Sequence, residues 1–598
     1  MKQKQAKSVM WGKKVLIALA LLLSASLAFA GPRKMSHDLE SKTSGKSANV
    51  DVIVQFNHVP TTIDHKRVAG HGGTLKRQLG HFRGALYTVS TARLAELAAD
   101  PNVAYVSPDR QLHGSSTSVS AWKLDYHNET INTAAASSQG LDGTGIGVAI
   151  IDSGIANVSD LNGSNIVYSQ DFTGDTVNGA ADQFGHGTHV AGIIAGNGNA
   201  STGANNVYTF KGVAGNANLI NLRVLDQNGN GTISEVIAAI QTAIQLQSTY
   251  NIRVINLSVG GPIWDSYTQD PLCQAVEQAW QSGIVVVVAA GNFGRDNNAG
   301  TNGYGTITSP GNDPYVITVG AMNTMGTADR TDDVIASYSS KGPSIGDNVV
   351  KPDLVAPGNL IVSLYTAADT LNVQNPGNEI PTSLYQTNGT SASSGSYFIL
   401  SGTSMATPMV SGAAALLLQQ NPNLTPDQVK ATLMRTAFKN LQQYATITDP
   451  TTGQTFNEQA DVFTVGAGYL DIQAALANTI LAPAAVGSAL SPIAVLNANG
   501  TVSLTQNGSS VLGGNDILWG DDILWGDDIL WGDDILWGDD ILWGDSMPLA
   551  ASDILWGDDI LWGDDILWGD DILWGDKVLW GSSAPQIQAA SVLWGTKN

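Results

Sequence analysis

The sequence predicts an α/β fold with a doubly wound, mostly parallel sheet. Between residues 122 and 480, short apolar runs such as GVAIID, VINLSVG, IVVVVAAGN and YVITVGA are typical of buried strands. They alternate with helix-like segments such as SEVIAAIQTAIQL, PLCQAVEQAWQSG and TPDQVKATLMRTA. Apolar strands that are bounded by glycine and separated by helices favour parallel strands with both faces of the sheet covered. The 598 residues are enough for this domain and for others beside it.

The chain starts with a basic segment, MKQKQAKSVMWGKK, followed by the apolar run VLIALALLLSASLAFA. The run ends in Ala-Phe-Ala, a small-residue pattern that is typical of a cleavage site. Residues 1–30 are therefore interpreted as a secretory signal peptide. A membrane anchor is the alternative, although the apolar run is short for a span. No later segment is long and apolar enough to cross a bilayer, so we expect a secreted protein without a membrane span.

Residues 31–113 are predicted to form a small α/β module. VDVIVQF, ALYTVS and VAYVSPD are typical of strands, and TARLAELAAD is typical of a helix. The last strand leads through RQLH into GSSTSVS, a segment rich in Gly and Ser. We expect the larger domain to follow it and to cover residues 114–481.

The composition excludes some classes of partner. The net charge of −23 predicts repulsion from nucleic acid and from anionic membranes, and an affinity for cations. Cys273 is the single cysteine, so no disulfide can form within the chain. An exported protein of this kind needs another source of stability, and a large core and bound metal ions are the usual ones.

Three short motifs stand at the ends of the predicted strands and helices. Asp152 in AIIDSG follows a buried strand, His186 in FGHGTHVAG begins an apolar helix, and Ser404 in SGTSMATPMVSG begins another helix. Each residue alone is explained as a turn or helix cap. A serine hydroxyl, however, becomes a nucleophile when a neighbouring base accepts its proton, and the three residues together supply this chemistry.

The three motifs resemble those of the subtilisin-like serine proteases, the subtilases. DSG, HGTHVAG and GTSMATP are each intact, and the order Asp, His, Ser is recognised from that family rather than deduced from the spacing. The resemblance covers residues 120–480. It implies that Ser404 is the nucleophile, that His186 is the general base and acid, and that Asp152 orients the imidazole. The module at 31–113 resembles the inhibitory propeptide of the same family.

The resemblance also implies an oxyanion donor and a substrate cleft. Asn292 in IVVVVAAGNFG resembles the oxyanion asparagine of the family, with a turn-forming Asn as the alternative. NLSVGG at 256–261 resembles the strand that pairs with an extended peptide substrate. Small residues on both walls predict that the residue before the scissile bond is large and apolar. The predicted wall residues are Ser258, Val259, Gly260, Ala289, Ala290 and Gly291.

Further features are implied by the same comparison. Asp160 in NVSDLNG aligns with a calcium-binding aspartate of the family, so we expect structural calcium there, with a solvated carboxylate as the alternative. The loop GNGNASTGANNVYTFKG departs from the family pattern. Residues 367–398 look like an insertion that could line the rim of the cleft. Met405 follows the nucleophile and implies sensitivity to oxidants, because a sulfoxide adds bulk and polarity.

The chain ends in a linker, residues 482–514, and an acidic repeat, residues 515–598. The unit I-L-W-G-D-D recurs every six residues, and 11 of the 15 tryptophans lie in the repeat. Strand-favouring residues followed by turn formers predict a β-coil with stacked Asp pairs that bind calcium. Disorder, aggregation-prone stickiness and a direct binding role are the alternatives.

The sequence as a whole predicts a secreted serine endopeptidase that is made as an autoprocessed zymogen. Its partners would be protein or peptide substrates and its own propeptide, which acts as an intramolecular inhibitor. The alternative is a surface-attachment or binding protein whose repeat tail is the functional part.

Overall fold

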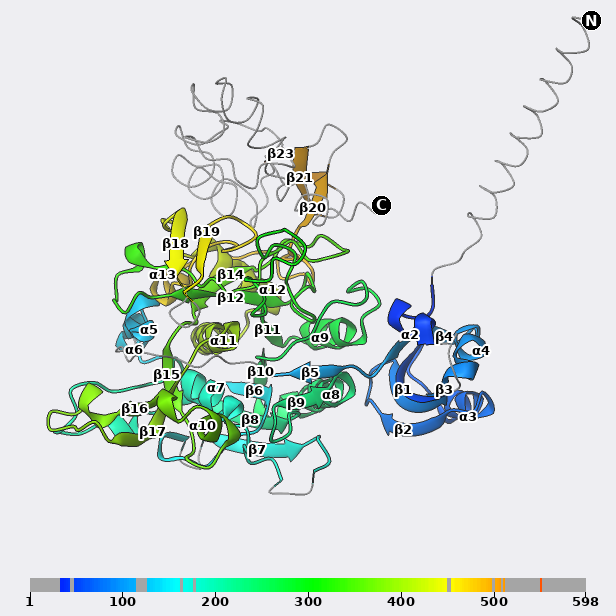
Figure 1. The fold of residues 1–598 in the computed structure, drawn as a ribbon, viewed down its shortest axis with the longest axis horizontal. Coiled ribbons are helices and arrows are strands. Elements are labelled where there is room, and N and C mark those ends of the chain that lie inside the picture. The colour runs from blue at the N-terminus through cyan, green and yellow to red at the C-terminus, as the bar shows by residue number, and fades with distance from the viewer. Residues whose placement is uncertain are drawn as a thin grey trace, which may run out of the picture. The chain divides into compact units, whose positions relative to one another are not determined.

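The computed structural model describes residues 33–42, 48–114, 126–161, 165–175, 179–448, 453–496, 501–506, 509–510 and 549–550. The predicted signal peptide and nearly all of the DDILWG repeat lie outside the described residues. The chain divides into two compact units (Figure 1). The described residues up to Gln78, together with Arg83–Pro108, form the first unit. Leu79–Phe82 and the described residues from Asp109 onward form the second.

The first unit is an antiparallel sheet with strand order β2-β3-β1-β4 and short helices. The three strands and the helix predicted for this region are confirmed. Helix α3 and strand β2 were not predicted, because TIDHKRVAG and TLKRQ are mostly polar. The elements are α2 (His37–Lys42), β1 (Asn49–Phe56), α3 (Thr62–Gly70), β2 (Thr74–Gln78), β3 (Gly84–Ser90), α4 (Leu94–Ala98) and β4 (Val103–Pro108).

The second unit is built on a mostly parallel sheet, as predicted. Its order within the described residues is β13-β12-β11-β10-β6-β8-β7, and β14 also pairs with β12. Every pair is parallel except β12 with β13. The strands are β6 (Gly147–Asp152), β7 (Ile166–Asp171), β8 (Asn218–Arg223), β10 (Ile252–Leu257), β11 (Val285–Ala289), β12 (Ile317–Asn323), β13 (Val334–Ile335) and β14 (Leu354–Pro357).

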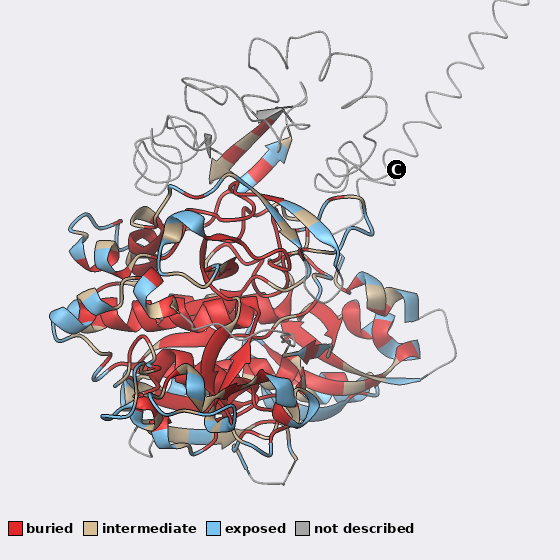
Figure 2. Cartoon of the chain, turned by 60° about the vertical axis from the view of Figure 1, so that its left-hand side comes forward, coloured by how far each residue is buried: buried red, intermediate tan, exposed pale blue. Residues whose placement is uncertain are grey.

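Helices cover both faces of this sheet. Helices α7 and α11 pack on each other and on its central strands, and α8 and α9 form a second packed pair over the same strands (Figure 1). Figure 2 shows α11 as a long, almost wholly buried helix. The helices are α5 (His127–Thr130), α6 (Ala134–Ser138), α7 (His186–Ala195), α8 (Ile233–Tyr250), α9 (Pro271–Gln281), α10 (Thr370–Gln374), α11 (Thr403–Gln420), α12 (Pro426–Arg435) and α13 (Ile472–Ala477).

Smaller sheets complete the second unit. The segment predicted as an insertion, residues 367–398, contributes α10, β16 and most of β17, and β17 pairs with both β15 and β16. Residues 482–514, predicted as a linker, instead include strands in their described part. The remaining strands are β5 (Gln111–His113), β9 (Asn230–Thr232), β15 (Ile361–Leu364), β16 (Glu379–Pro381), β17 (Ser393–Leu400), β18 (Tyr444–Thr448), β19 (Thr455–Gln459), β20 (Ile493–Leu496), β21 (Thr501–Gln506), β22 (Ser509–Ser510) and β23 (Leu549–Ala550).

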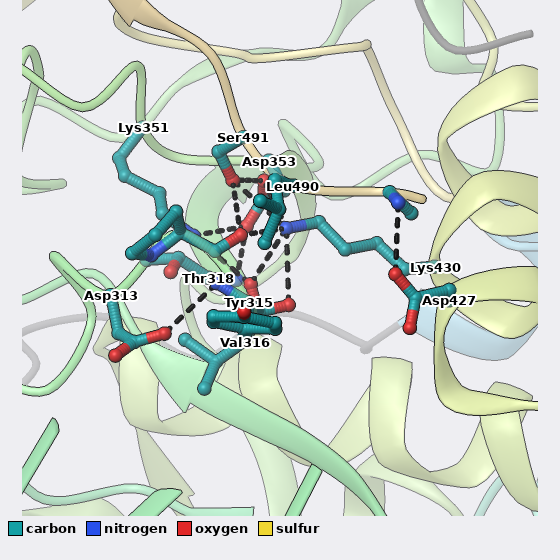
Figure 3. Close-up of polar contacts among 12 residues, drawn as sticks. Asp313, Tyr315, Val316, Thr318, Lys351, Asp353, Asp427, Lys430, Leu490 and Ser491 are labelled. Carbon is teal, nitrogen blue, oxygen red and sulfur yellow. Dashed lines mark hydrogen bonds and ion pairs between the residues drawn. The ribbon is translucent and has the colours of Figure 1, made fainter. Parts of the chain in front are cut away.

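A buried ionic cluster joins the C-terminal part of this unit to the sheet (Figure 3). Asp353 accepts hydrogen bonds from Lys351 Nζ at 2.7 Å, Ser491 Oγ at 2.5 Å and the Thr318 backbone N–H at 2.7 Å. Lys430 Nζ lies 3.1 Å from Asp353 Oδ1, the same oxygen that accepts the Ser491 hydroxyl. Burial lowers the pKa of Lys351 to about 7 in spite of the Asp353 charge. Removing one partner would leave a buried charge uncompensated, so the cluster fixes residues from β12, α12 and the segment after α13.

Candidate active site

The predicted catalytic residues lie at the ends of neighbouring elements of the second unit. Asp152 is the last residue of β6, Ser258 follows β10 directly, and Asn292 follows β11 by a short turn. His186 and Ser404 lie in the first turns of α7 and α11. Because β6, β10 and β11 are adjacent and parallel, their carboxyl ends meet at one edge of the sheet, where ligands of such folds bind.

Asp152 and His186 form a fully buried hydrogen-bonded pair. Asp152 Oδ1 lies 2.8 Å from His186 Nδ1, and both side chains are 0% exposed. The same carboxylate oxygen accepts the Ser153 backbone N–H at 2.7 Å. Within the part of the chain that is described, His186 Nε2 has no hydrogen-bond partner. The imidazole is thus oriented through Nδ1, and Nε2 is the nitrogen that can exchange a proton with a reacting group.

Electrostatics adjusts the pKa of the His186 imidazole in opposite directions. Burial alone lowers this pKa because it disfavours the imidazolium. The Asp152 charge, the hydrogen bond that Nδ1–H donates to Asp152, and the Asp182 charge raise this pKa, and the net shift is upward from 6.5. The imidazolium that forms during proton transfer is therefore stabilised.

Ser404 lies at the N-terminal end of α11 beside Ser258. Its hydroxyl donates to the Ser258 carbonyl at 3.0 Å, and the Ser258 hydroxyl donates to the Ser404 carbonyl at 2.9 Å. This reciprocal pair fixes the residue predicted as nucleophile against the strand predicted to line the cleft. A helix N-terminus also directs backbone N–H groups and a positive dipole end toward this point.

Asn292 is anchored to the same helix end. Its Oδ1 accepts the Thr403 backbone N–H at 2.9 Å and the Thr403 hydroxyl at 3.1 Å. These bonds occupy the acceptor end of the amide, so Nδ2 is the end that can donate to a developing oxyanion. The Asn292 side chain is thereby positioned by the residue that precedes Ser404.

An extended segment of the chain pairs with the predicted cleft strand. His113 forms an antiparallel bridge with Gly260, and on its other side β5 pairs antiparallel with β9. The Gly114 N–H donates to the Gly229 carbonyl at 3.0 Å. A Cβ on Gly114 would lie 3.0 Å from Leu225 Cδ1 and 3.8 Å from His186 Cγ. The segment therefore lies against His186 as an added strand, the mode expected of a substrate.

The predicted wall residues are close to each other, and a threonine from another segment lies against two of their glycines. A Cβ on Gly260 would lie 2.9 Å from Thr308 Oγ1, and a Cβ on Gly291 would lie 2.8 Å from Thr308 Cγ2. Thr308 is buried, and its N–H and hydroxyl both donate to the Ala290 carbonyl. Its side chain thus lies against a glycine of each wall, and the size of the residue before the scissile bond stays a prediction. The small residues on the two walls could not indicate that Thr308, from a third segment of the chain, lies against them.

Two buried carboxylates beneath His186 were missed by the sequence analysis. Asp182 accepts the Gly185 N–H at 2.7 Å and the Thr188 N–H at 2.8 Å, and so caps the helix that carries His186. Asp369, from the predicted insertion, lies against Gly185, where a Cβ would be 2.5 Å from its Cγ. Burial raises the pKa of Asp369 to about 7. The position of Asp182 just before an apolar helix could have indicated that it caps this helix.

The surroundings of Asp160 do not fit the predicted calcium site. Its Oδ1 accepts the Ala200 N–H at 2.7 Å, and its Oδ2 accepts the Tyr397 hydroxyl at 2.7 Å. The adjoining cavity, which Lys211 also lines, is only about 10 Å³. Calcium needs six to eight oxygen ligands, whereas these groups are hydrogen-bond donors and a lysine. In the described residues no group of three or more His, Cys, Asp or Glu could hold a metal ion.

The buried Asp–His pair beside a serine at a helix N-terminus is the arrangement of a serine hydrolase, and comparisons with known proteins identify the class further. The Subtilase family model matches residues 143–468. The chain is 34% identical to subtilisin E of Bacillus subtilis (strain 168) over 436 residues, which cover 72% of this chain and 94% of subtilisin E. It is 41% identical to the serine protease AprX of the same organism over 303 residues, 49% of this chain and 62% of AprX.

A solved structure supports the fold independently of the sequence matches. Fervidolysin from Fervidobacterium pennivorans, described as a keratinolytic enzyme related to subtilisin, gives a TM-score of 0.53 at 22% identity. The alignment covers 74% of this chain and 62% of fervidolysin. The chain belongs to the subtilase family and is a subtilisin-like serine endopeptidase that acts on protein substrates. Within the described ranges, no helix has both the length and the apolar character that a bilayer span requires.

The first prediction concerns pH. His186 must be neutral to accept a proton, so kcat/KM should rise with pH through the raised pKa, with a midpoint above 6.5. Asp182→Asn removes one of the charges that raise this pKa, so the midpoint should move to lower pH. Steady-state kinetics across the pH range measures both values. A wild-type midpoint at or below 6.5 would contradict the assignment.

The second prediction concerns calcium. Any stabilisation of the full-length protein by calcium should be the same in the wild type and in Asp160→Asn, because Asp160 is already hydrogen-bonded. Tyr397→Phe removes a buried donor to a carboxylate and should cost about 1.5–3 kcal/mol of stability. Tyr338→Phe is the control, since that buried hydroxyl donates to the Gly358 carbonyl rather than to a carboxylate. Thermal unfolding with calcium or EDTA measures the effects, and a calcium response lost in Asp160→Asn would refute the interpretation.

Proposed function

We propose that this protein is a secreted serine endopeptidase, made as a zymogen, in which Ser404, His186, Asp152 and Asn292 carry the reaction. The observation that carries the proposal is the buried 2.8 Å hydrogen bond between Asp152 and His186, next to helix α11, which has Ser404 in its first turn. The family membership supports the reaction class.

Catalysis begins when Ser404 Oγ turns from the Ser258 carbonyl toward His186 Nε2. The imidazole takes the hydroxyl proton as Oγ attacks the carbonyl carbon of the peptide bond. The oxyanion accepts hydrogen bonds from Asn292 Nδ2 and from backbone N–H groups at the start of α11. His186 then protonates the leaving amine, and an acyl ester remains on Ser404. Water enters, gives its proton to His186, and hydrolyses this ester.

The segment before residue 115 supports autoprocessing. Gln111–His113 forms an added strand in the cleft, and Gly114 lies against His186. Because Gly114 lies against His186, the bond that is cut would follow Ser115 or Ser116, the next residues in the sequence. This position lies within a few residues of the expected boundary between residues 113 and 114. The released segment would act as a product-like inhibitor.

The position of Thr308 supports a preference for a small residue before the scissile bond. A threonine that lies against both walls would leave less room between them for Leu or Phe. Ser115 and Ser116 satisfy this restriction. The same geometry explains why Gly260 and Gly291 are small, since a side chain on either would collide with Thr308.

Export and the repeat tail are separate parts of the proposal. The signal peptide, residues 1–30, and the repeat, residues 515–598, lie outside the described residues except for the short strand β23. A calcium-ordered β-coil that attaches the enzyme to a surface stays a prediction for the tail. The alternative, a binding protein with the tail as its functional part, is less well supported, because the buried Asp152–His186 pair and the family membership favour the enzyme.

The third prediction tests the nucleophile. Ser404→Ala should abolish hydrolysis of peptide substrates and should leave the full chain uncut, because the same serine cleaves both. Intact mass and N-terminal sequencing of the expressed protein measure processing, and the wild type should begin at residue 116 or 117. Ser411→Ala is a matched control in the same buried helix. Normal maturation of the Ser404→Ala protein would refute the autoprocessing proposal.

The fourth prediction tests Thr308. Thr308→Gly should raise kcat/KM for peptides with Phe or Leu before the scissile bond, relative to Ala, by about 10-fold or more. Thr306→Gly, two residues earlier in the same segment, should leave this ratio unchanged. A peptide series that differs only at this residue measures the ratio. An unchanged ratio in Thr308→Gly would show that Thr308 does not limit the size of the side chain.

A further inference from the structure

The segment that enters the cleft makes polar contacts before the strand β5 begins. Asp109 Oδ1 accepts the Ser234 backbone N–H at 2.9 Å, and its Oδ2 accepts the Ser234 hydroxyl at 2.7 Å. The Arg110 carbonyl accepts the Ile233 N–H at 3.0 Å. Ile233 and Ser234 open the 18-residue helix α8. A helix of this length attracts a carboxylate to its N-terminus. The first backbone N–H groups have no acceptor within the helix, and the helix dipole is positive at this end.

A second contact, next to the first, recognises a positive charge. Arg110 Nη2 lies 2.7 Å from Asp265 Oδ2, and the two side chains are 10% and 4% exposed. The guanidinium carbon of Arg110 also lies 5.8 Å from the centre of the half-exposed Trp264 ring. A buried carboxylate beside an aromatic ring is suited to an arginine, because the guanidinium can pair with the carboxylate and stack on the ring.

Both contacts belong to groups that stay on the enzyme when the segment leaves. If the chain is cut after Gly114, Asp109 and Arg110 depart, whereas Ser234, Asp265 and Trp264 stay. Asp265 then loses its arginine partner, and a cation from another peptide can pair with the carboxylate and stack on Trp264 in its place. The site therefore favours the return of a cation at the same place.

An extended peptide in the cleft delivers side chains at a fixed spacing of about 3.3 Å per residue, so its register decides which of them reach these groups. We propose that Ser234, Trp264 and Asp265 form an extended substrate-binding site for a basic side chain preceded by an acidic one. The basic residue lies four positions before the residue that packs on His186. This inference rests on the proposed endopeptidase function and identifies the class of protein substrate that the mature enzyme prefers.

Fluorogenic peptides test the site with the processed full-chain enzyme. The parent peptide has the sequence of residues 108–119, and a second peptide has glutamine in place of the arginine. A third has asparagine in place of the aspartate. We expect each replacement to lower kcat/KM, the glutamine peptide by about 10-fold, mainly through KM, and we expect added salt to reduce the difference.

Enzyme variants assign the effect to the proposed residues. Asp265→Asn should hydrolyse the arginine and glutamine peptides with equal kcat/KM, and Trp264→Ala, at an exposed position, should narrow the difference. Asp332→Asn, an exposed aspartate on another loop, is the control and should keep the wild-type ratio. Circular dichroism checks that each variant is folded. If Asp265→Asn does not fold, the peptide ratio of Trp264→Ala tests the proposed site instead.

The outcomes separate this inference from the proposed function. Equal hydrolysis of the three peptides by the wild type would overturn the extended site and leave the endopeptidase function intact. An arginine preference that persists in both Asp265→Asn and Trp264→Ala would also overturn it. Hydrolysis of none of the peptides by the wild type would instead overturn the proposed function.

Discussion

The burial of helix α11 on every side is the constraint on which the site depends. Its first 16 residues, from Thr403 to Leu418, are all buried, and it packs on α7 and on the central strands of the sheet. A helix in this position has no freedom to shift, because a close-packed interior transmits any displacement to its neighbours. Ser404 at its start is therefore fixed relative to the strand ends that carry Asp152 and Ser258.

Hydrogen bonds between neighbouring segments then set the finer geometry. Thr403 holds the Asn292 amide, Ser258 and Ser404 hold each other, and Asp182 caps the helix of His186. The contacts of Asn292 and Ser258 with the start of α11 join segments that are distant in the sequence, whereas Asp182 is close to the helix that it caps. The site is thus positioned by rigid elements rather than by loops alone, which suits a reaction whose rate depends on the placement of donors around a developing charge.

In the proposed zymogen, removal of Arg110 from Asp265 would connect maturation with substrate choice. While residues 109–114 occupy the cleft, Asp265 and the start of α8 are satisfied by Arg110 and Asp109. The same contacts that hold the segment would select later substrates. In a chain with a net charge of −23, a site for an arginine gains from the general attraction for cations, and a site for a carboxylate needs the local field of a helix terminus.

The class of fold and the candidates for the reacting groups could be predicted from the sequence, because buried parallel strands and the DSG, HGTHVAG and GTSMATP motifs are local patterns that a single stretch of chain carries. The same pattern indicated the strand that pairs with an extended peptide. The side chain that lies against the wall glycines, the partners of Asp160 and the contacts of Asp265 became visible only in the folded structure. Thr308, Tyr397 and Arg110 reach these places from distant segments, and no local pattern records which side chains meet once the chain has folded.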